Sequence, residues 1–168
     1  MLNKINYPFG CIRYILKFII PREIDSLYYE VAIHSYTPQV LTRIDLEIRK
    51  QQYRNRIVYS GLANGQVVHQ STLYYYLLLL IQSGIGKLPV IGGSVTLPEY
   101  RGLRIYPHIL SYIISDAKQY IPTNKIGIIV NPDNQVSIRG IERAGFQYVS
   151  RIHGYRIGPI FIKHKNRT

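Results

Sequence analysis

The feature that most constrains the fold is the stretch Ser94–Tyr120, which has the pattern of a strand, a short basic loop and a helix in direct succession. The strand end is apolar and β-branched, and Pro98 stops it because proline cannot donate to a strand ladder. Pro107 stands where the helix would begin, a position that tolerates proline. Pro122 marks the end of the helix.

The predicted helix has one apolar face and a basic, open beginning. Its apolar residues recur at steps of three and four: Ile109, Leu110, Ile113, Ile114, Ala117 and Ile121. A helix that starts directly after a Gly-containing loop presents free backbone N–H groups and a positive dipole end. Arg101 and Arg104 flank that end. The stretch therefore predicts an anion site, and a diphosphate is its natural ligand.

A second informative segment runs from Asn131 to Phe146. It begins with the turn Asn131-Pro132-Asp133-Asn134, whose side chains are suited to cap a helix. We expect a helix over residues 134–144, with Gly145 as its C-terminal cap. The residues before it, Lys125–Val130, have the composition of a buried strand.

Together these two segments resemble the acetyl-coenzyme A-binding half of the GCN5-related N-acetyltransferase (GNAT) superfamily. The loop V-T-L-P-E-Y-R-G-L-R-I-Y is similar to the family's Arg/Gln-x-x-Gly-x-Gly/Ala pattern, and the resemblance covers roughly residues 88–157. Arg101 and Gly102 fit the pattern, whereas Arg104 and Tyr106 stand where the family has Gly and Gly or Ala. An Arg at position 104 predicts a negative φ there, with the side chain turned away from the phosphates.

The rest of the chain gives a coarse order of elements. The clearest is a hairpin over Arg56–Tyr76 that turns at Asn64-Gly65, the strongest two-residue hairpin signal. Gly92-Gly93 predicts a bulge in a strand over residues 88–97. Residues 10–20 fit a helix or a strand, and residues 77–87 either extend the hairpin or connect it to the next strand. We also expect a strand over residues 24–33, a helix over 38–53, and final strands over 146–152 and 155–162 joined at His153-Gly154.

This order predicts a single α/β (α+β) domain over residues 1–168, with a central, mixed, mostly antiparallel sheet and helices on both faces. The resemblance implies that residues 88–157 form the cofactor-binding core and that the N-terminal half forms the acceptor side. It also implies acetyl-coenzyme A as the acyl donor, with no metal. The cofactor-binding residues that it implies are Val95, Leu97, Arg101, Gly102, Leu103, Arg104, Ile105, Tyr106 and Asn134. Asn134 fits a simple helix cap equally well.

The net charge of the chain calls for an anionic partner. The sequence has 21 Lys and Arg against 9 Asp and Glu, a formal charge of +12. The basic residues are dispersed, with K-H-K-N-R at residues 163–167 the one dense cluster, so coenzyme A or a nucleotide-linked sugar fits better than nucleic acid.

The longest strongly apolar run, residues 73–81, is too short to span a bilayer. The single cysteine, Cys11, excludes an internal disulfide. These features indicate a cytoplasmic protein without membrane insertion, and a homodimer stays open.

The catalytic groups are less evident than the cofactor loop. Transfer to an amine needs a base for the amine and a donor for the leaving thiolate. His69 and His34 are candidate bases, although a lone His in a strand is more often structural. The family's general-acid tyrosine corresponds to Ile141, which cannot donate, and Ser137 is the nearest hydroxyl on the same face. Ser137 or water would then return the proton, or the thiolate departs unprotonated and is stabilised by the helix end. Tyr74-Tyr75-Tyr76 either lines an acceptor pocket or packs in the core.

The sequence therefore predicts an acetyl-coenzyme A-dependent N-acetyltransferase that acts on a small-molecule primary amine. An amino sugar or nucleotide sugar of polysaccharide synthesis is the acceptor suggested by fold-level analogy, and protein N-termini, Lys side chains, polyamines and antibiotics stay open. The alternative is a catalytically idle anion- or nucleic-acid-binding module on the same fold, because the loop departs from the family pattern at positions 104 and 106.

Overall fold

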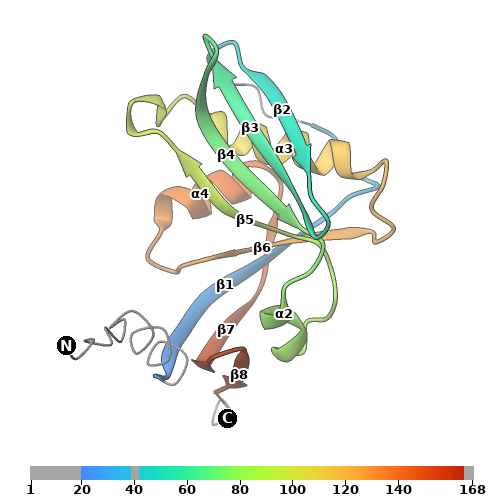
Figure 1. Ribbon diagram of the computed structural model, residues 1–168, viewed down its shortest axis with the longest axis vertical. Helices are drawn as coiled ribbons and strands as arrows, with labels where there is room; N and C mark the ends of the chain where they lie inside the picture. The colour runs from blue at the N-terminus through green and yellow to red at the C-terminus, as the bar shows by residue number, and fades with distance from the viewer. Residues whose placement is uncertain (1–19, 39–41, 165–168) are drawn as a thin grey trace, which may run out of the picture.

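The fold is built on one eight-stranded sheet (Figure 1). The computed structural model describes residues 20–38 and 42–164. The strands lie in the order β2-β3-β4-β5-β6-β1-β7-β8 across the sheet. Their bounds are Arg22–Ala32 (β1), Glu47–Gln52 (β2), Arg56–Ala63 (β3), Gln66–Tyr74 (β4), Val90–Thr96 (β5), Lys125–Val130 (β6), Gln147–Ile157 (β7) and Ile160–Lys163 (β8).

The sheet is mixed and mostly antiparallel, as predicted. Only β5 and β6 pair in parallel, and every other neighbouring pair is antiparallel. The strand β1 lies between β6 and β7, so the first described strand of the chain pairs with two of its last ones. Tyr28 of β1, for example, stands opposite Ile129 of β6 and Ser150 of β7.

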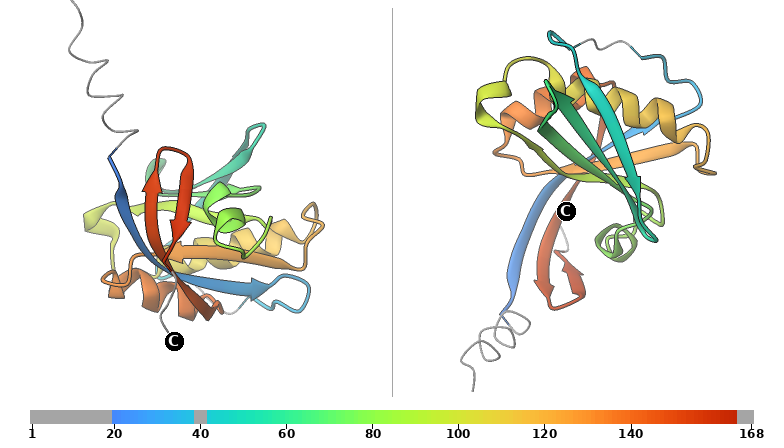
Figure 2. Two further views of the ribbon diagram at one scale, coloured as in Figure 1. Left: turned by 90° about the horizontal axis from the view of Figure 1, so that it is seen from below. Right: turned by 45° about the horizontal axis from the view of Figure 1, so that its top comes forward.

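Helices cover both faces of the sheet, which confirms the predicted layering (Figure 2). On one face, α3 (Ile105–Ala117) and α4 (Gln135–Arg143) pack over the larger core. On the other face, the short helix α2 (Leu78–Gln82) places Leu80 in a second, smaller core with Tyr28, Val90, Ile152 and Phe161. Residues 77–87 therefore form a helical connection, the second of the two predicted alternatives. A single 3₁₀ turn, η1 (Pro98–Tyr100), links β5 to the loop before α3.

The apolar face predicted for α3 is the centre of the larger core. Its apolar residues from Ile109 to Ala117 are fully buried: Ile109, Leu110, Ile113, Ile114 and Ala117. Burying each Ile or Leu side chain contributes about 1.5–3 kcal/mol. The helix begins two residues before the predicted Pro107, at Ile105. A final turn, in which the N–H of Ile121 donates to Ala117, ends before Pro122.

The predicted helix over residues 38–53 is wrong. Residues 47–52 form the edge strand β2, antiparallel to β3. The partly buried residues Ile44, Leu46 and Ile48 alternate with exposed charged ones, which is the two-residue period of a strand with one covered face. Pairing with β3 through a tight turn, where the N–H of Tyr53 donates to Arg56, fixes that period.

The two hairpins differ in how well their turns were predicted. Asn64 and Gly65 adopt φ of 50° and 78°, so the Asn-Gly turn is confirmed. The predicted turn at His153-Gly154 is wrong, because β7 runs unbroken to Ile157 and the chain turns after it. A Cβ at Gly154 would lie 2.2 Å from the carbonyl oxygen of Ile162. This glycine thus permits the close approach of β8 and does not mark a turn.

Some expectations concern parts of the chain outside the described residues. These are the segment at residues 10–19, with Cys11, and the last residues of the basic cluster at 163–167. Among the described residues, no helix is long and apolar enough to cross a membrane.

Candidate functional site

The central strands β5 and β6 separate after a very short contact. They pair only at Val90 with Gly127 and at Ile91 with Ile128. Beyond that point β5 continues with β4 alone. The register between β4 and β5 shifts opposite Ser71, and Gly93 has a φ of 61°, so the predicted bulge is confirmed. The far edge of β5 is thereby left open to a ligand.

The loop between η1 and α3 has a backbone that favours glycine at two positions. Gly102 has a φ of 80° and Arg104, the N-cap of α3, a φ of 62°. The expectation of a negative φ at Arg104 is therefore wrong. Arg104 takes the left-handed conformation that a glycine would adopt, at a cost of about 1–2 kcal/mol. The loop departs from the family in sequence at this position and keeps a glycine-like backbone.

A cavity of about 590 Å³ opens in front of this loop. The walls are β5, the loop, the first turn of α3 and one side of α4. Its charged lining is Arg101, Arg104, Arg139 and Arg143, and none of the described acidic residues lines it. Arg101 is held by a 3.4 Å hydrogen bond from its Nε to the carbonyl of Thr96. The first N–H groups of α3 have no carbonyl one turn earlier, so they add to the positive potential.

All but two of the predicted cofactor residues line this cavity. Those that do are Val95, Arg101, Gly102, Arg104, Ile105, Tyr106 and Asn134. Leu97 does not, and its N–H is taken by the carbonyl of Val68 at 2.9 Å. Leu103 packs toward the core, and its carbonyl accepts from the N–H of Arg43 at 3.1 Å. Whether the lining residues contact a cofactor stays a prediction.

The helix α4 forms the second wall. The Oδ1 of Asn134 accepts from the N–H of Ser137 at 3.1 Å, so Asn134 caps the helix as well as lining the cavity. Ser137 also lines the cavity. A Cβ at Gly140 would lie 2.7 Å from the ring of Tyr106. Gly140 therefore lets α4 and the start of α3 approach closely.

His69 does not reach the cavity itself. Its ring is 1% exposed and lies on β4, tilted against the ring of Tyr106 at 5.8 Å. Burial lowers the pKa of His69 to about 4, so the ring is neutral near pH 7. Nδ1 lies 2.7 Å from Thr96 Oγ1 and Nε2 2.8 Å from Ser71 Oγ. Ser71 Oγ lies in turn 2.8 Å from Ser94 Oγ. Two hydroxyl residues that line the cavity are thus tied to a buried histidine, Thr96 directly and Ser94 through Ser71.

The other candidates lie away from this cavity. His34 is exposed after β1, and its backbone N–H donates to Asn124 at 3.3 Å. Tyr74 covers Gly92, since a Cβ there would be 3.5 Å from its ring. The hydroxyl of Tyr75 accepts from Gln52, and Tyr76 is exposed beneath Lys87. None of these residues lines the basic cavity.

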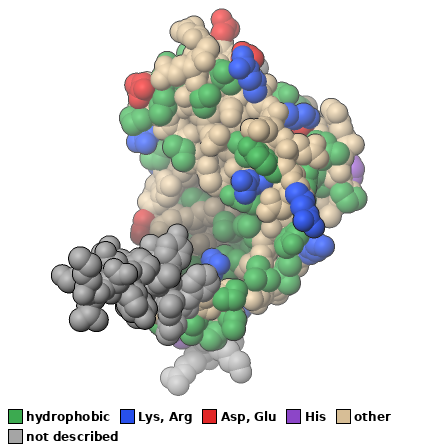
Figure 3. Space-filling model, viewed as in Figure 1, with side chains coloured by type: hydrophobic (Ala, Val, Ile, Leu, Met, Phe, Trp, Pro, Cys, Tyr) green, Lys and Arg blue, Asp and Glu red, His purple; other side chains and the backbone are tan. Residues whose placement is uncertain are grey.

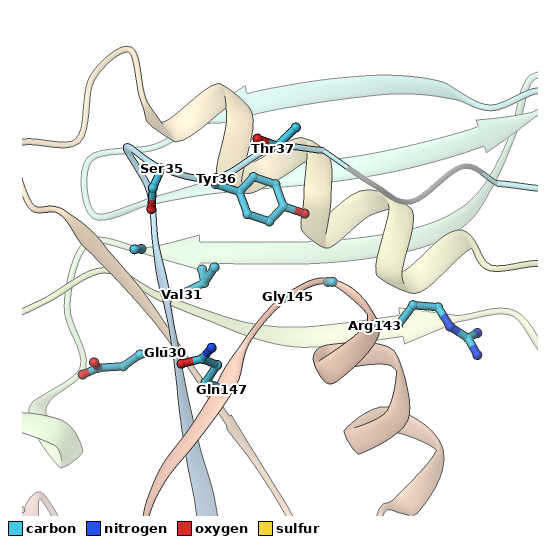
Figure 4. Close-up of a pocket in the computed structure, with 10 residues that line it drawn as sticks. Glu30, Val31, Ser35, Tyr36, Thr37, Arg143, Gly145 and Gln147 are labelled. Atoms are coloured by element: carbon cyan, nitrogen blue, oxygen red, sulfur yellow. The ribbon is translucent and has the colours of Figure 1, made fainter.

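A second cavity of about 320 Å³ lies at the C-terminal end of α4 (Figure 4). Gly145, with a φ of 91°, forms part of it and confirms the predicted helix cap. The acid in its lining, Glu30, already accepts from Tyr28 at 2.8 Å and Lys125 at 2.7 Å. Arg143 points away from Glu30 and Gln147 in Figure 4. This cavity therefore offers no free acid and no histidine or cysteine among its described lining, and the basic cavity is the better candidate site.

Several lining residues of the basic cavity were missed from the sequence: Ser94, Thr96, Tyr100, Val136, Arg139, Gly140 and Arg143. Arg139 and Arg143 carried a usable signal, because they stand one helical turn apart on the predicted second helix. Ser94 and Thr96 carried none, since their link to His69 depends on the register of β4 and β5. In the described part of the chain, no three His, Asp or Glu side chains are placed to hold a metal ion.

Comparison with known proteins identifies the fold. No protein-family model and no curated protein sequence matches the chain. A structure from Novosphingobium aromaticivorans, described as an acetyltransferase of the GNAT family, superposes with a TM-score of 0.52 at 14% identity, over 78% of this chain and 64% of that one. A GNAT-family acetyltransferase of Colwellia psychrerythraea gives 0.52 at 12% identity, over 90% and 63%.

A third structure, a GCN5-related N-acetyltransferase-like protein of Streptococcus suis, gives a TM-score of 0.50 at 12% identity over 90% of this chain and 68% of that one. The chain spans less than two thirds of the length of the first two structures. At these identities the comparisons show the fold, which is that of the GNAT acetyltransferases.

Proposed function

We propose that this chain with a GNAT fold is an acetyl-coenzyme A-dependent N-acetyltransferase that acts on a primary amine. The observation that carries the proposal is the basic cavity. Four arginines line this cavity in front of the open start of α3, none of the described acidic residues lines it, and an unpaired strand edge leads into it. A long anionic ligand with an amide-bearing arm fits this combination of charge and shape.

Different residues of the cavity fit different parts of coenzyme A. Arg101, Arg104 and the N–H groups that begin α3 would hold the diphosphate. The side chains of Val95 and Val136, 63% and 71% exposed, would cover the apolar stretches of the pantetheine arm. The hydrogen bond from Leu97 to β4 points the backbone N–H of its neighbour Thr96 to the open edge, where it would pair with the arm, while the Thr96 carbonyl accepts from Arg101. Bound acetyl-coenzyme A would supply an activated thioester.

The proton donor is proposed from the residues of the second wall. Ser137 lies in the first turn of α4 and lines the cavity, so its hydroxyl is placed to hold a proton near the positive helix end. A general acid contributes about a hundredfold or more. Ser137→Ala should lower turnover by that order at nearly constant cofactor affinity, and a change below about threefold would assign Ser137 a structural role.

For the acceptor, we propose an amino sugar or nucleotide sugar over a polyamine. The formal charge of +12 repels a cationic acceptor and attracts a phosphate-bearing one. A screen of amine acceptors with detection of the released thiol would test this choice.

The rival function is an idle anion- or nucleic-acid-binding module. It was suggested by the departure of the loop from the family pattern at positions 104 and 106. At the first of these positions, Arg104 keeps the left-handed backbone that a glycine would adopt. On the face shown in Figure 3, Lys and Arg side chains are scattered and form no continuous stripe of the kind that follows a nucleic-acid backbone. Both observations favour the acyltransferase.

Thermal unfolding with and without acetyl-coenzyme A tests the proposal. At 100 times its Kd, a ligand that binds only the folded state adds about 2.7 kcal/mol to the unfolding free energy. Arg101→Gln should reduce this gain. A matched control is Arg54→Gln, which removes the same charge at an exposed residue outside the cavity. No stabilisation of the wild-type chain at millimolar acetyl-coenzyme A would refute the proposed function.

A further inference from the structure

The hairpin of β7 and β8 carries an uncovered apolar face, formed by Tyr155, Ile157, Ile160 and Ile162, which we call the hairpin patch. Tyr155 pairs with Ile162 and Ile157 pairs with Ile160, so all four side chains point to one face of the sheet. They are 36–57% exposed. Phe161 points to the other face, where it is buried in the smaller core beside α2. The hairpin is therefore apolar on both faces, and only one of them is covered.

The hairpin patch lies apart from the site of the proposed function. In Figure 1 the hairpin and the start of β1 form the lower end of the molecule, while α3 and α4 lie in its upper half. None of the four residues lines either cavity. The face of an antiparallel sheet that is left to solvent is normally polar. A contiguous apolar patch on such a face marks an interaction surface.

Basic side chains flank the hairpin patch. Arg22, at the start of β1, stands opposite Arg156 of β7, and Lys163 of β8 follows Ile162. All three side chains are exposed. Within the described part of the chain, none of them takes part in an ion pair. Their charges are therefore available to an anionic partner.

Two acidic side chains share the face of the hairpin patch, and both are partnered. Glu23 lies 2.9 Å from His153 Nε2, and Asp25 accepts from Arg151 at 2.6 Å. The unpaired charge around the patch is thus positive. Two copies of the chain joined at this hairpin would bring like charges together, whereas an anionic surface would neutralise them.

The chain reaches this end of the molecule through a segment of similar chemistry. Most of residues 1–19 are apolar, Lys4, Arg13 and Lys17 lie among them, and no acidic residue does. The segment is followed by β1, whose first residue pairs with β7 within the hairpin patch. Apolar residues mixed with Lys and Arg are typical of segments that bind at a lipid interface. Two neighbouring parts of the chain therefore have the composition of lipid-binding surfaces.

We propose that the hairpin patch docks on an anionic lipid surface. The four apolar side chains enter the interface, and Arg22, Arg156 and Lys163 contact the lipid phosphates. A membrane surface buries apolar groups and meets positive charge at nearly the same depth. This docking is interfacial and requires no membrane-spanning segment. It does not depend on the proposed acyltransferase activity.

Sedimentation of the full chain with lipid vesicles tests the proposal. The anionic probe is a vesicle of equal parts phosphatidylcholine and phosphatidylserine, and the reference is a vesicle of phosphatidylcholine alone. The wild-type chain should bind the anionic vesicle more tightly, and added salt should weaken this binding. Failure to bind the anionic vesicle would overturn the proposal.

Variants of the hairpin separate its apolar and charged contributions. Ile160→Thr combined with Ile162→Thr keeps the β-branched shape and should weaken vesicle binding about tenfold, through lost apolar burial. Lys163→Gln should weaken binding to the anionic vesicle alone, by about fivefold. Val67→Thr, at a residue 49% exposed on β4 and away from β7 and β8 in the sheet, is the matched control and should change neither. Equal binding by the wild type and the double variant would refute the role of the patch.

Two measurements without vesicles test whether protein covers the patch instead. Light scattering should give the mass of one chain, and a dimer that the double variant dissociates would assign the patch to a second copy. The denaturant midpoint of the double variant should equal that of the wild type. A clearly lower midpoint would mean that the chain itself covers the patch. Either of these results would overturn the lipid assignment.

Discussion

The two ends of α3 differ in whether the charged side chains around them are paired with opposite charges of the protein. At the C-terminal end Asp116 is 9% exposed and accepts from Lys50 at 2.7 Å and Tyr59 at 2.8 Å, with Tyr120 also in contact. The basic cavity at the N-terminal end is lined by four arginines and by none of the described acidic residues. Charge that is matched inside the protein stabilises the fold, and charge left unmatched around an open helix end is available to a ligand.

The largest expected effect is a loss of stability in acid at the N-terminal end of α3. Burial lowers the pKa of His69 from 6.5 to about 4, so the unfolded chain takes up this proton first as the pH falls. The stabilising contribution is complete above pH 6.5 and is lost between pH 6.5 and 4, by about 3 kcal/mol for this shift. Denaturant unfolding across this range should show a steeper decline for wild type than for His69→Gln. Parallel curves would contradict it.

Next in size is the loss of Asp116 at the opposite end. Asp116→Ala removes the acceptor of Lys50 and Tyr59, although Tyr59 keeps its bond with the Tyr120 hydroxyl, and should lower the unfolding free energy by about 2 kcal/mol. Because Lys50 is about half exposed, water offsets part of its loss. The affinity for coenzyme A should stay constant, and a tenfold change in Kd would mean that the two ends are coupled.

A smaller effect is expected where α3 meets α4. Gly140→Ala brings a methyl group to within 2.7 Å of the Tyr106 ring, so Tyr106 or α4 must shift. Overpacking of this kind costs about 1–3 kcal/mol, and we expect the low end because the cavity gives the ring room to move. The variant should also bind coenzyme A several-fold more weakly, as measured by calorimetry. Gly92→Ala, whose Cβ would meet the Tyr74 ring at an ordinary contact distance of 3.5 Å, controls for loss of glycine alone.

The smallest expected effect is that of Arg104→Gly, which should stabilise the fold and weaken ligand binding. Arg104→Gly removes a side chain from a left-handed residue and should raise the unfolding free energy by up to about 1 kcal/mol, since relief of strain is partly offset by the flexibility of glycine. It also removes one charge from the cavity, so coenzyme A should bind more weakly. Equal or lower stability in denaturant unfolding would show that the loop holds Arg104 without strain.

Local signals made much of the fold predictable from the sequence. The stripe of α3 and the turn at Asn64-Gly65 each depend on a few neighbouring residues, and both are confirmed. The strand β2 was missed because its apolar residues are few and lie among charges, so its pairing with β3 decides its conformation. The turn at Gly154 was wrongly predicted because the sequence does not distinguish a glycine required by a close neighbouring strand from one required by a turn.

The residues of the site were likewise predictable where they lie in one contiguous segment and not where distant segments come together. The loop around Gly102 and the cap Asn134 lie in contiguous segments, and the sequence located both. Ser94 and His69 are 25 positions apart and are linked, through Ser71, only by the register of β4 and β5, which no local pattern encodes. The left-handed conformation of Arg104 was not predictable because the side-chain identity argues against it.

The central place of β1 in the sheet has a consequence for how the chain is made. Its two partners, β6 and β7, are synthesised about a hundred residues after it. At about 5–20 residues per second, β1 leaves the ribosome with both edges unpaired and waits roughly 5–25 seconds for β7. Such an edge can pair with other chains in the meantime. Completion of the sheet therefore depends on strands that emerge late. Chaperone binding to the nascent chain until then would protect the unpaired edges of β1.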